Sequence, residues 1–188
     1  MKRKIMENKI TAIKILAAAL IVVFLVSYIP RNINVEYPAI RYPESGSDVV
    51  QTSVVIKGKL SRPLFSSPTF KGTIIIEDYN FTKEDRLLSL KFGKDFEESN
   101  DLVYESYDAN TGYLDMKGVG YIWILGNMDK ICIWGAAPEN VGATGDFEEV
   151  IISAPAETKE DAVQIADQLL PESVNSKFSG ESMSLEME

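Results

Sequence analysis

The longest apolar stretch of the chain lies near its amino terminus. Twelve residues from Ile15 to Val26 are apolar without a break, and extending the run to 10–29 adds a single charge, Lys14. Twenty helical residues span about 30 Å, the hydrocarbon thickness of a bilayer. Lys14 is near enough to one end of the run for its ammonium group to reach the headgroups. The pattern predicts a transmembrane helix over 10–29.

The end of this segment argues against removal by a signal peptidase. A cleaved secretory signal needs small residues just before the cut, whereas Tyr28 and Ile29 are bulky. A lipid anchor needs a cysteine after the apolar run, and the single cysteine is Cys132. We therefore predict an uncleaved signal anchor, with a cleaved signal or a buried helix of a soluble domain as alternatives. Basic residues precede the span, so residues 1–9 are expected in the cytoplasm and the rest outside.

Residues 30–48 contain three prolines and a Ser-Gly-Ser sequence, without apolar periodicity. This composition predicts an extended stalk between the membrane and a folded domain. An edge strand formed by Val35, Tyr37 and Ile40 is the alternative.

Short strand patterns follow one another over 49–170. Because they recur at roughly ten-residue spacing without long helical patterns between them, we expect a mainly β fold, an antiparallel sandwich or barrel-like domain. The hairpin over 121–134 is apolar on both faces and is expected at the centre of the core. The predicted strands are 49–60, 70–79, 87–92, 102–107, 112–117, 121–125, 130–134 and 147–153.

One C-terminal helix is predicted next to this sheet. Thr158 and Asp161 form a variant of the capping box, apolar residues follow at helical spacing, and Pro171 ends the pattern. The same four letters at 82–85 indicate a single helical turn. The acidic tail over 171–188 has little periodicity and is expected to be disordered.

Composition excludes several kinds of chemistry. The 188 residues include no histidine and one cysteine, which removes Ser-His-Asp and Cys-His catalysis, histidine-ligated zinc and an internal disulfide. Of the formal net charge of −9, residues 1–31 carry +5, which leaves −14 on the rest of the chain. This acidity argues against nucleic acid as a partner and favours a domain that stands clear of anionic headgroups.

Candidate ligand groups are weakly patterned, so we assign no catalytic, cofactor-binding or metal residue. Asp108 and Asn110 alternate as in a calcium loop, but the sequence around Gly112 is equally that of a turn between two strands. Paired carboxylates that could hydrolyse a glycan occur at 97–98, at 105 and 108, and at 148–149.

Three further features have simple structural interpretations. We interpret Cys132 as a small buried hydrophobe. Gly118 and Gly120 read as bends at a strand end. The loop Arg62–Pro68 is either a contact surface or a cover with Phe65 packed under the sheet.

Residues 58–65 (Gly-Lys-Leu-Ser-Arg-Pro-Leu-Phe) and 70–73 (Phe-Lys-Gly-Thr) resemble small membrane-anchored extracytoplasmic proteins of Gram-positive bacteria. The resemblance implies an anchored β-rich protein and carries no activity or site residues. The expected function is a non-enzymatic extracytoplasmic binding or interaction module that needs no cofactor. The alternatives are a carboxylate-dependent hydrolase of envelope glycans, or an accessory subunit whose span packs on a membrane transporter or sensor.

Overall fold

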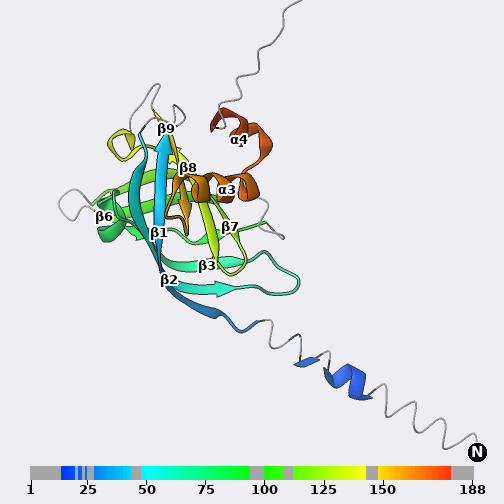
Figure 1. Cartoon of the computed structure of the whole chain (residues 1–188). Coiled ribbons are helices and arrows are strands. Elements are labelled where there is room, and N and C mark those ends of the chain that lie inside the picture. Colours follow the sequence, from blue (N-terminus) through cyan, green and yellow to red (C-terminus); the bar gives the residue numbers. More distant parts are fainter. Residues whose placement is uncertain are drawn as a thin grey trace, which may run out of the picture.

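The computed structural model describes residues 14–19, 21–22, 24, 28–43, 48–93, 100–107, 112–142 and 148–178. Within these residues the strands form a single antiparallel sheet in the order β4-β6-β7-β8-β9-β1-β2-β3-β5 (Figure 1). The strands are β1 (Arg31–Pro43), β2 (Val50–Ser61), β3 (Thr69–Ile76), β4 (Arg86–Leu87), β5 (Leu90–Lys91), β6 (Asn100–Tyr107), β7 (Leu114–Leu125), β8 (Lys130–Ala136) and β9 (Glu149–Ala154). The prediction of a mainly β, antiparallel fold is confirmed.

The sheet curls until its two ends meet. The backbone N–H of Lys91 in β5 donates to Asn100 Oδ1 in β6 at 3.1 Å, and the Asn100 amide donates back to the Lys91 carbonyl. Across the interior, the Tyr104 hydroxyl of β6 donates to the carbonyl of Ile74 in β3 at 2.5 Å. One curled sheet, and not two separate packed sheets, therefore encloses the main core.

The hairpin of β7 and β8, which was expected at the centre of one core because it is apolar on both faces, lies between two apolar clusters. Ile122 and Ile133 point into the curled sheet with the main core. Trp123 and Cys132 point to the outer face, where they pack in a second cluster. Side chains alternate between the two faces of a strand, so a hairpin that is apolar at every position must be covered on both sides.

A helix covers the second cluster. α3 (Lys159–Leu169) begins where the Asp161 backbone N–H donates to Thr158 Oγ1 at 3.2 Å, so the predicted cap is confirmed. Buried residues of this helix, among them Ala162 and Ile165, pack over β1, β8 and β9. Figure 1 shows α3 lying across the sheet. The predicted single turn is also present, as α2 (Phe81–Glu84), and a 3-10 helix, η1 (Pro138–Asn140), follows β8.

The prediction of a disordered tail from residue 171 is wrong for its first part. α4 (Glu172–Phe178) follows Pro171 directly, and its Val174 is buried in the second cluster. The Val174 N–H donates to the Pro171 carbonyl at 2.9 Å, so proline starts this helix as well as ending the previous one. Residues 179–188 lie outside the described part.

The predicted stalk is a strand for most of its length. β1 pairs with β2 from Arg31 to Arg41 and with β9 from Ile40 to Pro43, so its first part has one paired neighbour and its last part lies inside the sheet. The alternative of an edge strand over Val35, Tyr37 and Ile40 is therefore closer to the structure than the stalk. Pro38 was one reason to predict a stalk. It lies in the half of β1 that pairs with β2 alone, so its missing N–H costs no hydrogen bond on the unpaired side. Residues 44–47 are outside the described part.

Two predicted strand boundaries also change. The separate strands expected at 112–117 and 121–125 are one strand, β7, whose pairing with β6 shifts register between Leu102 and Val103. The strand expected at 87–92 is divided into β4 and β5, which pair with opposite ends of the sheet. The remaining predicted strands are present with ends shifted by a few residues.

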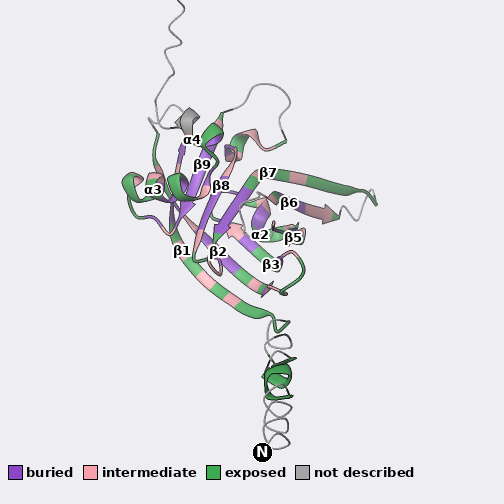
Figure 2. Cartoon of the chain, turned by 90° about the vertical axis from the view of Figure 1, so that its right-hand side faces the viewer, coloured by how far each residue is buried: buried purple, intermediate pink, exposed green. Residues whose placement is uncertain are grey.

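The described residues before β1 lie beyond the end of the sheet where β1 begins (Figure 2). Residues 14–19, 21–22 and 24 are helical. Among the described residues, no helix has both the length and the apolar character needed to cross a bilayer. Part of the predicted span 10–29 lies outside the described residues, so the transmembrane helix stays a prediction.

Candidate binding pocket

The sequence suggested one candidate metal site, around Asp108 and Asn110. Asp108 and Asn110 lie outside the described residues, and within the described ones no three potential ligands cluster. Gly112 has φ +73°, the left-handed conformation that the turn interpretation predicts.

Two of the three proposed carboxylate pairs include residues outside the described part, namely 97–98 and Asp108. Glu105 forms an ion pair with Arg86 at 2.9 Å. Glu148 is exposed before β9, whereas Glu149 lies on β9 and faces an indole.

Cys132 is the buried hydrophobe that the sequence indicated. Its side chain is fully buried and its Sγ lies 3.7 Å from the Ser153 hydroxyl oxygen. Burial raises the pKa of this thiol to about 12, partly offset by the contact with Ser153, so the nucleophilic thiolate is suppressed at neutral pH.

A pocket of about 370 Å³ opens where β7 and β8 separate. Backbone pairing between these strands stops at Gly120 and Gly135, and β8 continues toward η1 while β7 continues along β6. The space between them is therefore bounded by strand backbone on two sides and by the segment after β8 on a third. Its lining residues are Asp101, Val103, Gly118, Val119, Gly120, Tyr121, Trp134, Gly135, Ala136, Asn140, Gly142 and Glu149.

Two glycines facing each other allow the strands to meet at the pocket floor. A Cβ on Gly120 would lie 2.1 Å from the Trp134 carbonyl oxygen, and one on Gly135 would lie 1.9 Å from the Val119 carbonyl oxygen. Gly120 also has φ +150°, which side chains rarely adopt. Gly118, by contrast, would place a Cβ in open space with nothing within 4 Å. Gly120 and Gly135 thus allow the close approach of the two strands at the pocket floor, and Gly118 leaves the space above it unfilled.

An aromatic pair forms one wall. Tyr121 of β7 and Trp134 of β8 are directly opposite in register, and their rings stack with centroids 5.7 Å apart at 26°. The Trp134 Nε1–H donates to Glu149 Oε2 at 3.2 Å, which fixes the indole plane. Asp101 of β6 is opposite Tyr121 on the other side, so a carboxylate flanks each end of the pair.

The wall remains accessible on the Tyr121 side, whereas Trp134 packs partly against the second cluster. Tyr121 is 44% exposed, whereas Trp123, two residues along the same face, is 4% exposed under the helix. A flat ligand can therefore contact the aromatic pair without displacing the second cluster.

The charge of the lining restricts what can bind. Two carboxylates and the amide of Asn140 supply its charged and amide side chains, and no lysine or arginine of the described chain lines it. Buried anion sites need basic side chains or helix amino termini. The pocket therefore suits neutral or cationic organic groups with a flat apolar face, by stacking, cation–π contact and hydrogen bonding to oxygen.

Sequence reasoning missed this site. Gly118 and Gly120 were interpreted as bends, and Trp134 as a core residue. The available signal was the combination of spaced glycines with an aromatic residue on each of two adjacent predicted strands. Asp101 and Glu149 meet at this pocket because of the register of the four strands β6, β7, β8 and β9. That register cannot be read from neighbouring residues in the sequence.

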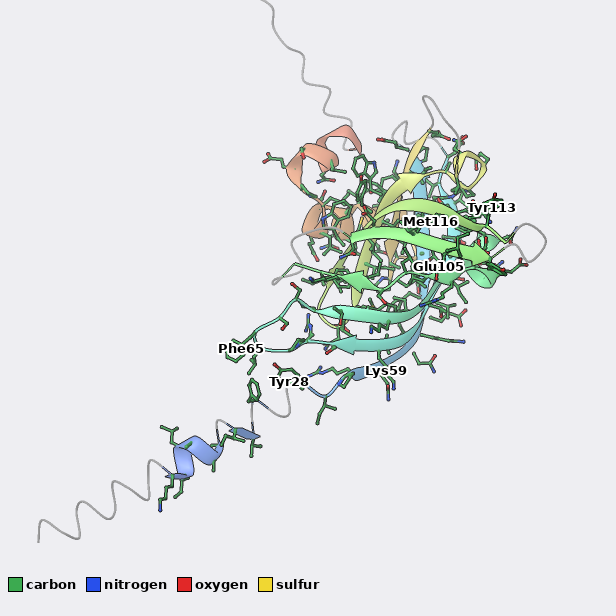
Figure 3. All side chains as sticks on the ribbon, turned by 180° about the vertical axis from the view of Figure 1, so that it is seen from behind. Tyr28, Lys59, Phe65, Glu105, Tyr113 and Met116 are labelled. Atoms are coloured by element: carbon green, nitrogen blue, oxygen red, sulfur yellow. The ribbon has the colours of Figure 1, made fainter. Side chains whose placement is uncertain are left out.

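A second surface lies at the end of the β2–β3 hairpin, next to the amino-terminal helix. Leu64 and Phe65 in the connecting loop are 55% and 77% exposed, and Tyr28 and Ile29 beside them are 47% and 66% exposed. The ring of Phe65 lies 6.0 Å from that of Phe24 in the helix. We call Tyr28, Ile29, Leu64 and Phe65 the tip surface, and Figure 3 shows two of its members together. The alternative with Phe65 packed under the sheet is therefore wrong, and the contact surface stays a prediction.

Arg62 fixes this loop to the sheet. Its guanidinium donates to the Gly126 carbonyl at 2.6 Å and to Asn127 Oδ1 at 3.1 Å, both in the turn between β7 and β8. Burial lowers the pKa of Arg62, and the positive charge of Arg31 nearby adds to this. The hydrogen bonds of Arg62 therefore hold the tip loop in a defined position at one end of the domain.

A third exposed apolar region is the projecting hairpin of β6 and β7. Tyr107, Tyr113, Leu114 and Met116 are each at least 60% exposed. Tyr113 and Met116 lie on the opposite side of the domain from Tyr28 and Phe65 (Figure 3). The hairpin is separate from the tip surface.

Comparison of the chain with known proteins finds no matching family, no matching curated sequence and no matching solved structure. The function is therefore argued from the residues described above.

Proposed function

We propose that this chain is a single-pass membrane-anchored protein whose extracytoplasmic domain is a non-enzymatic binding module, with the pocket between β7 and β8 as its ligand site. The resemblance to anchored Gram-positive extracytoplasmic proteins is part of this proposal. Support for the anchor is the apolar run over 10–29 with basic residues before it. The observation that carries the binding function is the exposed Tyr121–Trp134 wall flanked by Asp101 and Glu149.

The ligand class follows from this wall. A sugar ring or an organic ammonium group has a face that packs on an indole, together with polar or positive groups that carboxylates accept. A phosphate or carboxylate ligand would meet two negative side chains without a basic partner in the lining. We therefore assign neutral or cationic organic ligands to the pocket and exclude anions.

The position of the pocket is compatible with an anchored domain. Tyr121 lies four residues from Leu125, the last residue of β7 before the turn that Arg62 binds. At about 3.4 Å per residue, the aromatic wall is roughly 14 Å from that turn, farther along the sheet from the tip surface. A soluble ligand can then reach the pocket while the tip end faces the membrane.

Trp134 provides a direct reporter of binding. The chain has two tryptophans, and replacing Trp123 by phenylalanine leaves Trp134 as the single indole. Trp123 Nε1 has no hydrogen-bond partner among the described residues, so the substitution removes an unsatisfied buried donor. We expect choline or N-acetylglucosamine at millimolar concentration to change Trp134 fluorescence in a saturable way, and inorganic phosphate to cause no change.

Gly118→Leu is the matched variant for this experiment. Its side chain would enter open space in the pocket without a backbone clash, so we expect lost binding with an unchanged unfolding midpoint. A fluorescence change that persists in Gly118→Leu, or the absence of any saturable change with both probes, contradicts the proposal. Glycan hydrolysis that Asp101→Asn abolishes would favour the hydrolase alternative instead.

A further inference from the structure

We propose that the tip surface and a row of lysines on β2 and β3 dock the domain directly on an anionic lipid surface. This inference rests on the membrane anchor of the proposed function, and it concerns a part of the molecule separate from the pocket. The domain would then lie against the bilayer and not stand away from it on a stalk.

The length of chain between helix and sheet requires close approach. The predicted span ends at Ile29, and β1 begins at Arg31. One residue, Pro30, lies between them, so the sheet starts where the lipid headgroups begin. The correction of residues 31–43 from stalk to strand therefore removes the spacer that would keep the domain off the membrane.

The depth of Phe65 follows from its neighbour. Phe24 lies five residues before Ile29, so a helical span places Phe24 about 8 Å inside the end of the apolar segment. The Phe65 ring is 6.0 Å from the Phe24 ring, and Phe24 also contacts Tyr28 at 4.9 Å. A membrane that embeds Phe24 therefore takes up Phe65 as well when basic side chains hold the tip surface against it. Exposed aromatic residues at this depth are typical of membrane interfaces.

Basic side chains surround the tip surface. Lys59 and Lys71 are directly opposite each other on β2 and β3, and Lys57 lies two residues along the same face. All three are exposed, and they form no ion pair with a carboxylate among the described residues. Like charges directly opposite each other destabilise a sheet unless an anion lies near them. Figure 3 places Lys59 on the same side of the domain as Tyr28 and Phe65.

The acidic total charge does not oppose this arrangement. The −14 outside residues 1–31 is an average, and screening limits each surface charge to a range of about 10 Å. Arg31, Lys57, Lys59 and Lys71 therefore determine the potential that headgroups meet at the tip end. Basic clusters next to a span are attracted to anionic lipids. The expectation of a domain standing clear of the membrane is replaced by contact with it.

The test uses the full chain reconstituted in vesicles, with a fluorophore on Ser66→Cys. Ser66 is exposed in the tip loop, and Cys132 is fully buried and so stays unlabelled. Lys83→Cys on α2, beyond the opposite end of β3, is the matched control position. Brominated lipids quench a fluorophore that enters the acyl region.

We expect strong quenching at position 66 in vesicles that contain phosphatidylglycerol, and none at position 83. Lys59→Glu with Lys71→Glu, or vesicles of phosphatidylcholine alone, should remove most of the quenching. Equal signals at the two positions, or quenching at position 66 that charge reversal leaves unchanged, would overturn the inference. Release of the chain by alkaline carbonate would instead overturn the anchor, so the two failures are distinguishable.

Discussion

Gly120 is the position where the pocket geometry makes the sharpest quantitative prediction. An alanine Cβ there would lie 2.1 Å from the Trp134 carbonyl oxygen and 2.5 Å from the Gly135 Cα, both backbone atoms that cannot rotate away. The φ of +150° adds conformational strain for any side chain. Strain of this kind costs about 1–3 kcal/mol, and overpacking costs a similar amount. We therefore expect Gly120→Ala to lower the free energy of unfolding by about 3 kcal/mol.

Gly118→Ala is the matched control, because the same change is made two residues away on the same strand. Its Cβ meets nothing within 4 Å and its φ is not in the left-handed region. Replacing glycine by alanine at a compatible position stabilises a protein by about 0.4–1 kcal/mol. The control should therefore be neutral or slightly more stable than the original chain.

Thermal unfolding of the full chain in detergent micelles measures both variants. For a chain of this size, about 3 kcal/mol corresponds to a fall in Tm of roughly 9 °C. Equal Tm values for Gly120→Ala and Gly118→Ala would refute the close approach of β7 and β8 at the pocket floor.

Three further predictions concern the rest of the domain. Thr158→Ala removes the acceptor of the Asp161 N–H and should cost about 1 kcal/mol in urea unfolding, whereas an unchanged midpoint would show that the cap adds nothing. Tyr104→Phe leaves the buried Ile74 carbonyl without its hydroxyl donor and should cost about 1–2 kcal/mol, a loss that a neutral result would contradict. Folding raises the pKa of Cys132 from 9.0 to about 12, so between these pH values the native state holds a proton that the unfolded chain releases. The contribution of this thiol to the free energy of unfolding is therefore complete below pH 9 and is lost as the pH rises toward 12. Denaturant titrations across this range should show the fall beginning near pH 9, and in Cys132→Ala only near the tyrosine range above pH 10, whereas identical profiles would contradict the assignment.

The parts of the fold that were predictable are those with a local pattern. Alternation in 49–60 and the short apolar run in 130–134 predict strands, and the Thr158 cap predicts a helix, because backbone geometry and side-chain burial act within a few residues. The stalk prediction failed because Pro38 was judged by its neighbours in sequence. Its environment is set by Ser53, which lies fifteen positions away and pairs with it across β1 and β2.

The pocket was not predictable for the same reason. Asp101, Tyr121 and Trp134 are adjacent because of the register of β6, β7 and β8, and the register shift beside Leu102 decides which side chains face outward. The exclusion of histidine chemistry needed no such information, since composition alone determines it.

The proposed function depends on an uncleaved apolar segment that holds the β domain on the outer side of the membrane. Its most direct test is to wash membranes of cells producing the full chain with alkaline carbonate, and to treat intact cells without their wall with protease. We expect the full-length chain to stay in the membrane pellet and external protease to digest its domain. A polypeptide that begins near residue 31 in the culture medium, or a full-length chain that carbonate releases, would contradict it.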